Sequence, residues 1–206
     1  MEAIRQLLEV REVKGPAPAF TSVQLLYAVI LIGSSAVMGR KRLKDLLGIG
    51  EGSVRTMVSR LVSNGLASSS REGLRLTEKG MELYSYLNKT ISELKRVVFE
   101  MPWDAKHNFG LVVRGMAGRV STGVEERDEA VRNGASAAMV LTYTESGLEM
   151  PRVSNLSLER PEFAGRIISL FNPSVGDVVI IAGADDEMRS RYAALAAAVK
   201  LAVGKA

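Results

Sequence analysis

The chain lacks cysteine and has very little histidine. Its 206 residues include no Cys and one His, His107. Without thiols the chain forms no disulfide and no thiolate metal site, and an intracellular location is favoured. A single imidazole is too few for the usual zinc sites and hydrolytic triads. We therefore expect a cytoplasmic protein that is not an enzyme, with no catalytic residue, no metal and no cofactor.

Long hydrophobic runs are also missing. The most apolar run, Val23–Ile32, is about half of the ~20 residues that a membrane-spanning helix needs, so it predicts a buried helix. The N-terminal residues are charged throughout and lack the continuous apolar region of a secretory signal. Hydrophobic residues at 47% and charged residues at 24% are ordinary for a globular protein. We expect no membrane partner.

Positive charge is concentrated in one part of the chain. Residues 1–103 contain 15 Lys and Arg against 10 Asp and Glu, whereas residues 104–206 contain 12 against 13. Residues 39–75 alone hold 8 basic and 3 acidic side chains. Such clustering is expected of a surface that binds a polyanion, although a merely solvated basic face is the alternative.

The first half of the chain reads as helices followed by a hairpin. Thr21 and Gln24 have the spacing of a capping box, which starts a helix that runs to about Gly33. Apolar spacing and turn residues predict the other elements. These are helices at 2–14, 40–47 and 51–64, strands at 66–68 and 74–76, and a long helix from a Thr77 cap to about Phe99.

The long helix carries a short heptad pattern. Its apolar residues alternate three and four apart, at Tyr84, Leu87, Ile91, Leu94 and Val98. Packing within its own domain is one explanation. Because the stripe runs about two heptads past the hairpin, we favour a homodimer contact through the helix Glu78–Phe99.

Met101-Pro102-Trp103 is the predicted domain boundary, which separates a domain at 1–100 from one at 105–206. The second half alternates strands and helices in the order β-α-β-β-α-β-α, compatible with a ferredoxin-like α/β sandwich. The predicted class of the whole chain is α+β. The expected strands are 109–114, 137–143, 148–150 and 178–181, and the expected helices are 124–133, 161–171 and 186–203.

The segment LGIGEGSVRT, residues 47–56, has three glycines at alternate positions. A dinucleotide fingerprint needs G-x-G-x-x-G after a strand, but Ser53 takes the third position and the preceding segment is a predicted helix. A P-loop needs Gly-Lys-Ser/Thr, and the local sequence is Gly-Ser-Val. Both phosphate-binding interpretations fail.

A helix-turn-helix fits this segment better. Gly48 takes the turn position, apolar side chains surround it, and Val54 and Met57 anchor the second helix. One preference is missed, because Lys44 stands where a small residue is favoured at the helix crossing.

Residues 22–99 resemble the winged-helix transcriptional regulators of archaea and bacteria. The resemblance lies in Val54-x-x-x-Val58-x-x-Leu61-x-x-x-Gly65-Leu66 and in Leu74-x-Leu76-Thr77-x-x-Gly80, which are similar to the family's recognition helix, wing and following helix entry. It implies a regulator that binds double-stranded DNA. The second half resembles only the small α/β domains attached to such regulators in archaea, which implies a ligand-sensing or assembly domain.

In that interpretation the exposed side chains of the second helix enter the major groove, where Arg reads guanine and Ser or Thr contacts several bases. Basic residues before the turn meet phosphates, and two arginines of the hairpin meet the minor groove or backbone. The predicted DNA-binding residues are Arg40, Lys41, Arg42, Lys44, Ser53, Arg55, Thr56, Ser59, Arg60, Arg71 and Arg75.

The second half offers one candidate ligand site. Arg114 and Arg119 flank a glycine-bearing loop before a predicted helix whose Thr122 and Glu125 have capping-box spacing, an arrangement suited to a small anionic ligand. A plain connecting loop is the alternative. An enzyme acting on an anionic metabolite would need this loop and the acids at 185–187 to meet in one pocket. A winged helix used for protein–protein assembly is the other alternative.

Overall fold

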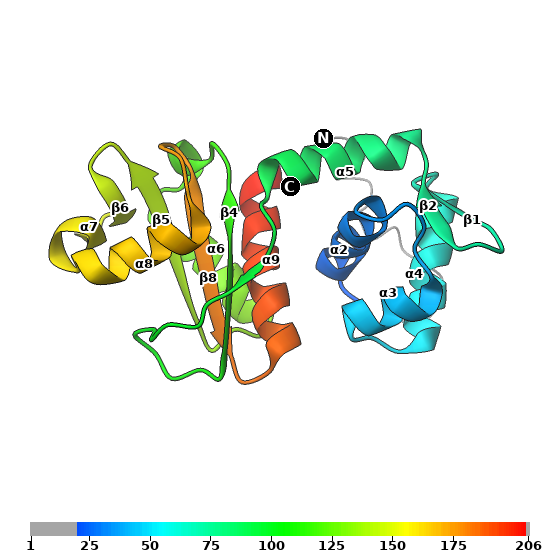
Figure 1. Ribbon diagram of the computed structural model, residues 1–206, viewed down its shortest axis with the longest axis horizontal. Coiled ribbons are helices and arrows are strands. Elements are labelled where there is room, and N and C mark those ends of the chain that lie inside the picture. Colours follow the sequence, from blue (N-terminus) through cyan, green and yellow to red (C-terminus); the bar gives the residue numbers. More distant parts are fainter. Residues whose placement is uncertain (1–19, 205–206) are drawn as a thin grey trace. The chain divides into compact units, whose positions relative to one another are not determined.

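The computed structural model describes residues 20–204 and divides into two compact units. Unit 1 extends to Asn88 and unit 2 begins at Lys89 (Figure 1). This division falls earlier than the predicted boundary at Met101–Trp103, which lies inside unit 2. The helix predicted at residues 2–14 lies outside the described residues.

Three helices form most of unit 1: α2 (Ser22–Gly33), α3 (Arg40–Leu47) and α4 (Glu51–Ser63). The predicted capping box at the start of α2 is confirmed, because the Gln24 N–H donates to Thr21 Oγ1 at 3.2 Å and the Thr21 N–H donates to Gln24 Oε1 at 2.8 Å. Each helix turns one apolar face inward. The core of these helices consists of Leu25, Leu26, Ala28, Val29, Ile32, Leu43, Leu47, Val54, Met57, Val58 and Leu61.

A short antiparallel hairpin follows α4. Its strands are β1 (Ala67–Ser69) and β2 (Leu74–Leu76). Met38, between α2 and α3, adds a single bridge to Leu74, with both backbone N–H···O distances at 2.9 Å. This bridge attaches the segment before α3 to the hairpin. The hairpin is therefore linked to α3 by the bridge and to α4 by the chain itself.

The next helix, α5 (Glu78–Thr90), begins where Thr77 ties it to the end of α4. The Thr77 hydroxyl donates to the Gly65 carbonyl at 2.6 Å and accepts from the Gly80 N–H at 3.2 Å. A Cβ on Gly80 would overlap the Leu66 carbonyl oxygen. The Leu-Thr-x-x-Gly sequence therefore caps α5 and lets its first turn press against the backbone of Leu66.

The prediction that this helix continues to Phe99 is wrong. After Thr90 the backbone is extended: Ile91 bridges to Val113, and the Ser92 N–H donates to the Val112 carbonyl at 2.9 Å. The chain then forms β3 (Lys95–Arg96). Because the residues from Ile91 onward are not helical, the predicted heptad seam does not exist beyond Leu87.

A six-stranded antiparallel sheet is the centre of unit 2, with the strand order β3-β4-β8-β5-β6-β7. Two very short strands, β3 and β7, form its edges. The remaining bounds are β4 (His107–Val113), β5 (Ala137–Thr144), β6 (Gly147–Met150), β7 (Ser154–Asn155) and β8 (Val178–Ala184).

Helices cover both faces of this sheet. On one face lie α6 (Val124–Arg132) and α9 (Glu187–Val203), and on the other lie α7 (Leu156–Glu159) and α8 (Pro161–Phe171) (Figure 1). All seven residues of the central strand β8 are therefore buried. A short 3₁₀ helix, Ala117–Arg119, precedes α6.

The mixed α+β class is confirmed, and within the described residues there are eight α-helices and two antiparallel sheets. The ferredoxin-like arrangement is wrong for unit 2, because that sandwich keeps its helices on one face of the sheet. Here α6 and α8 pack on opposite faces, and β7 is inserted between β6 and the helices that lead to β8. None of the described helices is long and apolar enough to cross a membrane.

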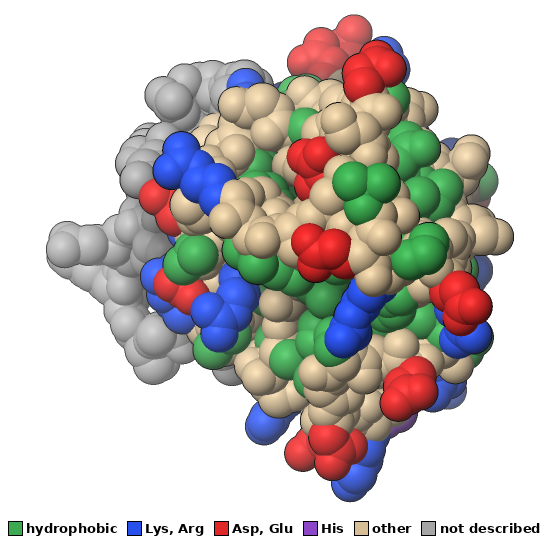
Figure 2. Space-filling model, turned by 90° about the vertical axis from the view of Figure 1, so that its left-hand side faces the viewer, with side chains coloured by type: hydrophobic (Ala, Val, Ile, Leu, Met, Phe, Trp, Pro, Cys, Tyr) green, Lys and Arg blue, Asp and Glu red, His purple; other side chains and the backbone are tan. Residues whose placement is uncertain are grey.

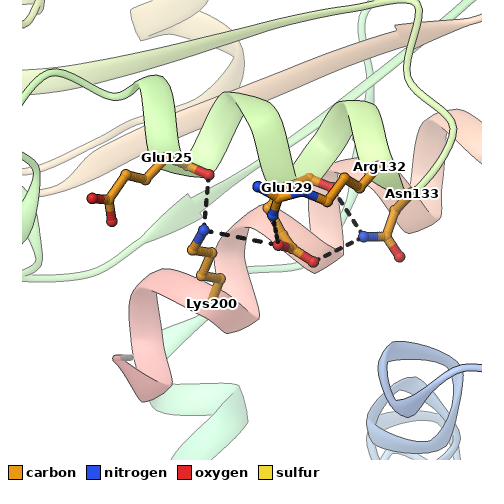
Figure 3. Close-up of polar contacts among 5 residues, drawn as sticks. All are labelled: Glu125, Glu129, Arg132, Asn133 and Lys200. Carbon is orange, nitrogen blue, oxygen red and sulfur yellow. Dashed lines mark hydrogen bonds and ion pairs between the residues drawn. The ribbon is translucent and has the colours of Figure 1, made fainter. Parts of the chain in front are cut away.

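Polar contacts join α6 to α9 on the outer side of their shared face (Figure 3). The Lys200 ammonium donates to the Glu125 carbonyl at 3.1 Å and lies 3.8 Å from the Glu129 carboxylate. Arg132 and Asn133 donate to the same carboxylate, at 2.7 and 3.0 Å. The Glu129 carboxylate thus accepts hydrogen bonds from the end of its own helix and forms an ion pair with α9. Helix α9 is buried largely through small side chains, among them Ala193, Ala194, Ala197 and Ala198.

Replacing Gly80 by Ala should destabilise unit 1. The added methyl group meets the Leu66 carbonyl, and overpacking of this kind costs about 1–3 kcal/mol, which outweighs the gain in helix propensity. Urea denaturation measures the change. Gly165→Ala in α8 is the matched control, since the described residues leave open space around that helical glycine. A Gly80→Ala protein at least as stable as Gly165→Ala would contradict this account of the contact.

Candidate nucleic-acid interface

The turn between α3 and α4 is three residues long. Gly48 ends α3 in the left-handed region, with φ of 63°, and its N–H donates to the Lys44 carbonyl at 2.9 Å. A left-handed conformation at this position favours glycine because it has no Cβ. Ile49 follows, and Gly50 is the N-cap of α4. Gly48 therefore occupies the turn as predicted.

Helix α4 has one buried and one exposed side. Val54, Met57, Val58 and Leu61 are between 0% and 5% exposed. The predicted outward residues all avoid this stripe, as their helical spacing requires. Arg55, Thr56 and Ser59 are exposed, and Ser53 and Arg60 are half-buried at the margin.

Small side chains run along the middle of the exposed side. Gly52, Thr56, Ser59 and Ser63 are four, three and four residues apart, which places them in one line on the helix surface. All four are exposed, and the Thr56 hydroxyl donates to the Gly52 carbonyl at 3.1 Å, so it lies against its own helix. Another molecule can approach the α4 backbone closely along this line.

Neither torsion nor packing explains the glycines at the start of α4. Gly50 has φ of −68°, an ordinary value for any residue, and Gly52 is helical. Within residues 20–204, no atom lies within 4 Å of a Cβ built on either glycine. Glycine in a helix is less favourable than alanine by up to about 1 kcal/mol. Glycine is favourable at an N-cap, which accounts for Gly50, whereas no packing contact among the described residues requires glycine at position 52.

Basic side chains project from α3 beside the hairpin. Arg40, Lys41 and Arg42 are exposed and Lys44 is half-buried, while Leu43 and Leu47 face the core. The Arg40 guanidinium donates to the Ser69 hydroxyl of β1 at 3.0 Å. This bond brings the start of α3 next to the hairpin.

The hairpin contributes two arginines of different character. Arg71 is exposed in the turn that closes the hairpin. Arg75 donates to the Glu72 carboxylate at 2.8 Å, with 54% of its side chain exposed. The partner of Arg75 is thus an acid of the same hairpin, whereas Arg71 stands at the tip.

The charged side chains of unit 1 are all accessible to solvent. Its described residues include nine Lys and Arg against five Asp and Glu, and none of these fourteen is buried. One acid lies on α4 itself: the Glu51 carboxylate is 3.8 Å from the Arg55 guanidinium, one turn away. The sequence reasoning passed over Glu51, although its place between two glycines was the available signal.

The predicted ligand loop of unit 2 is held by internal contacts. Asp177, which is 4% exposed, accepts the N–H groups of Gly115 at 2.8 Å and Ser174 at 2.9 Å. Its carboxylate lies 4.0 Å from the Arg114 guanidinium, and Arg119 donates to the Ala202 carbonyl at 3.4 Å. Both arginines therefore have partners within unit 2.

The helices α6 and α9 begin with different caps. The predicted capping box at the start of α6 is wrong, because Gly123 is the N-cap and Thr122 Oγ1 accepts only from the Val124 N–H, at 3.4 Å. At α9 the Asp186 carboxylate accepts the Arg189 N–H at 2.9 Å, an ordinary helix cap.

The arginine loop and the acids at 185–187 do not meet. Arg114 follows β4 at the end where Val113 pairs with Val178, whereas Asp185 follows β8 at the other end, where Ala184 pairs with His107. Seven residues of strand span roughly 20 Å. Among the described residues, no group of three or more His, Asp and Glu side chains is placed to hold a metal. The common pocket that the enzyme alternative requires is therefore missing.

Three open depressions lie elsewhere in unit 2, and two of them form a groove between α8 and residues 98–102, with volumes of 560 and 930 Å³. The third, of 690 Å³, is lined by residues between Arg96 and Asn108. Hydrophobic side chains are exposed between charged ones on the face that Figure 2 shows. Val98, which is 84% exposed, and the edge-to-face pair Phe99–Phe163 line the groove, with Glu162 and Arg166. Sequence reasoning missed this groove because it assigned Val98 to a helix.

Two family models match separate parts of the chain. The model of the PH0730-like N-terminal domain matches residues 26–82, within unit 1, and that of a domain of unknown function, DUF4443, matches residues 105–201, within unit 2. No curated protein matches the chain.

A solved archaeal structure is similar to the whole chain. It is the hypothetical protein PH0730 from Pyrococcus horikoshii OT3, with 28% sequence identity and a TM-score of 0.66. The alignment covers 88% of this chain and 92% of that one. The similarity therefore extends over both units.

Proposed function

We propose that this chain is a DNA-binding transcriptional regulator and that unit 1 is its winged helix-turn-helix. In this assignment α3 and α4 are the helix-turn-helix, α4 is the recognition helix, and the β1–β2 hairpin is the wing. The order of helices, three-residue turn, hairpin and following helix supports it.

The observation that carries the proposal is the exposed side of α4. It presents a line of small residues at Gly52, Thr56 and Ser59, with Arg55 and Arg60 on its two flanks. Among the described residues, no packing contact requires glycine at position 52. A helix built this way suits the major groove, where the backbone lies close to base edges and arginine can donate to guanine.

The other basic residues have complementary roles in this proposal. Arg40, Lys41, Arg42 and Lys44 on α3 meet backbone phosphates and supply affinity without sequence selection. Arg71, at the tip of the wing, reaches the minor groove or the adjacent backbone. Arg75 is less available, because Glu72 pairs with it.

For unit 2 we propose assembly or ligand sensing through the groove along α8. The partly exposed aromatic pair Phe99–Phe163 and the exposed Val98 support this role, since exposed apolar surface marks interaction sites. A small anionic ligand at Arg114 and Arg119 has less support, because both side chains have partners in unit 2. Homodimerisation stays a prediction, but a helix reaching Phe99 no longer supports it.

The experiment that tests the proposal is selection of bound sequences from random duplex DNA by the full-length protein. We expect one motif to be enriched. Arg55→Ala or Arg60→Ala should weaken binding to that motif by about 1–3 kcal/mol and relax the preference at one position. Equal loss on specific and random duplexes would assign these arginines to phosphates. Failure of the wild type to enrich any sequence would contradict the regulator assignment.

Gly52→Ala should separate folding from binding. Alanine has a higher helix propensity than glycine, so the free energy of unfolding should rise by up to about 1 kcal/mol. The methyl group also projects from the middle of the exposed side of α4, so duplex binding should fall about tenfold or more. Urea denaturation and fluorescence anisotropy with a labelled duplex measure the two effects.

Ser85→Ala in α5 is the matched control for this variant. It also replaces a poor helix former by alanine at an exposed helical position of unit 1, but outside the proposed DNA surface. We expect a smaller gain in stability with unchanged duplex affinity. If Gly52→Ala bound the duplex as well as Ser85→Ala does, α4 would not approach DNA at this turn.

A further inference from the structure

Glu51 is an exposed acid among the basic side chains of unit 1. It is the first residue of α4, its side chain is 82% exposed, and glycine stands on either side of it. Its carboxylate lies 3.8 Å from the guanidinium of Arg55, whose side chain is 78% exposed. Both groups therefore project together from the first turn of the helix.

A carboxylate at this place weakens attraction to any duplex, because it repels phosphates. It is also chemically selective. An ionised carboxylate only accepts hydrogen bonds, and in the major groove the donors are the amino groups of cytosine and adenine. Guanidinium only donates, and its best partner there is guanine. A C·G base pair presents a donor and acceptors side by side.

We propose that Glu51 is a specificity-determining residue of this DNA surface and that Glu51 and Arg55 together read one C·G base pair. This inference rests on the proposed function and adds the base class to it. Glu51 accepts from the cytosine amino group, while Arg55 donates to the guanine of the same pair. The flanking glycines bring this turn close enough for the short contact that a carboxylate needs.

A purely structural role for Glu51 makes a different prediction. An acid in the first turn of a helix interacts favourably with the helix dipole, and an acid four residues before an arginine stabilises the helix slightly. Loss of those effects would weaken folding a little and would reduce binding to all sequences alike. Base preference is therefore the readout that separates the two roles.

The test compares wild type, Glu51→Gln and Glu78→Gln by selection from random duplexes and by titration with single-base variants of the selected site. Glu78→Gln is the matched control, because Glu78 is also an exposed acid that starts a helix of unit 1. For the wild type we expect about tenfold preference for C·G at one position. Glu51→Gln should lose that preference, or shift it toward adenine, while binding random duplex about twofold more tightly at low salt.

The outcomes distinguish this inference from the function on which it rests. An altered preference at one position in Glu51→Gln, with Glu78→Gln like wild type, supports the inference. An unchanged preference in Glu51→Gln overturns it and leaves the DNA-binding proposal intact, as does an equal loss at every position. A wild-type protein that enriches no sequence removes both. Circular dichroism checks that each variant is folded.

Discussion

The four side chains that α4 buries, Val54, Met57, Val58 and Leu61, fix the rotation of that helix. Each contributes about 1.5–3 kcal/mol when removed from water. The exposed Glu51–Arg55 pair, by comparison, adds at most about 0.5 kcal/mol. Apolar packing therefore decides how α4 is rotated, and this rotation determines which polar side chains face solvent.

That constraint links the glycines, the arginines and the acid of α4. Once the helix is fixed, Gly52 lies in the middle of the exposed side, with arginines on both flanks. No packing contact among the described residues requires a glycine in the middle of this helix, and an exposed acid would repel phosphates at the proposed DNA surface. Both features have a common explanation if base edges lie against this turn. The similarity to the archaeal protein PH0730 extends over both units.

Sequence spacing predicted those parts of the fold that local forces determine. Helices α2, α3, α4 and α8 follow from the spacing of apolar and turn residues, and the start of α2 follows from its capping box. The continuation of α5 was wrong for a tertiary reason. Residues such as Ile91 fit a heptad pattern, but hydrogen bonds to distant Val112 and Asn108 draw this segment into the sheet. The spacing of apolar residues within one segment gives no information on hydrogen-bond partners that lie so far along the chain.

The same distinction applies to the candidate sites. The outward residues of α4 were predictable, because one helical period separates them from the core. The partner of Arg114 was not, since Asp177 is far away in the sequence and comes close only through the pairing of β4 with β8. Strands β3 and β7 have only two residues each, too few to show an alternation of apolar and polar side chains. Because these two edge strands could not be recognised in the sequence, the strand order of the sheet could not be derived either.

The central claim is that the exposed side of α4 binds duplex DNA. Backbone amide NMR of the full-length protein, titrated with a mixed-sequence duplex, tests it most directly. We predict that the largest shift changes fall on residues 50–56 of α4, with smaller ones at residues 40–44 and at the tip of the hairpin. Shift changes confined to unit 2, or none at protein and duplex concentrations of about 100 µM, where even weak non-specific binding is populated, would contradict the account.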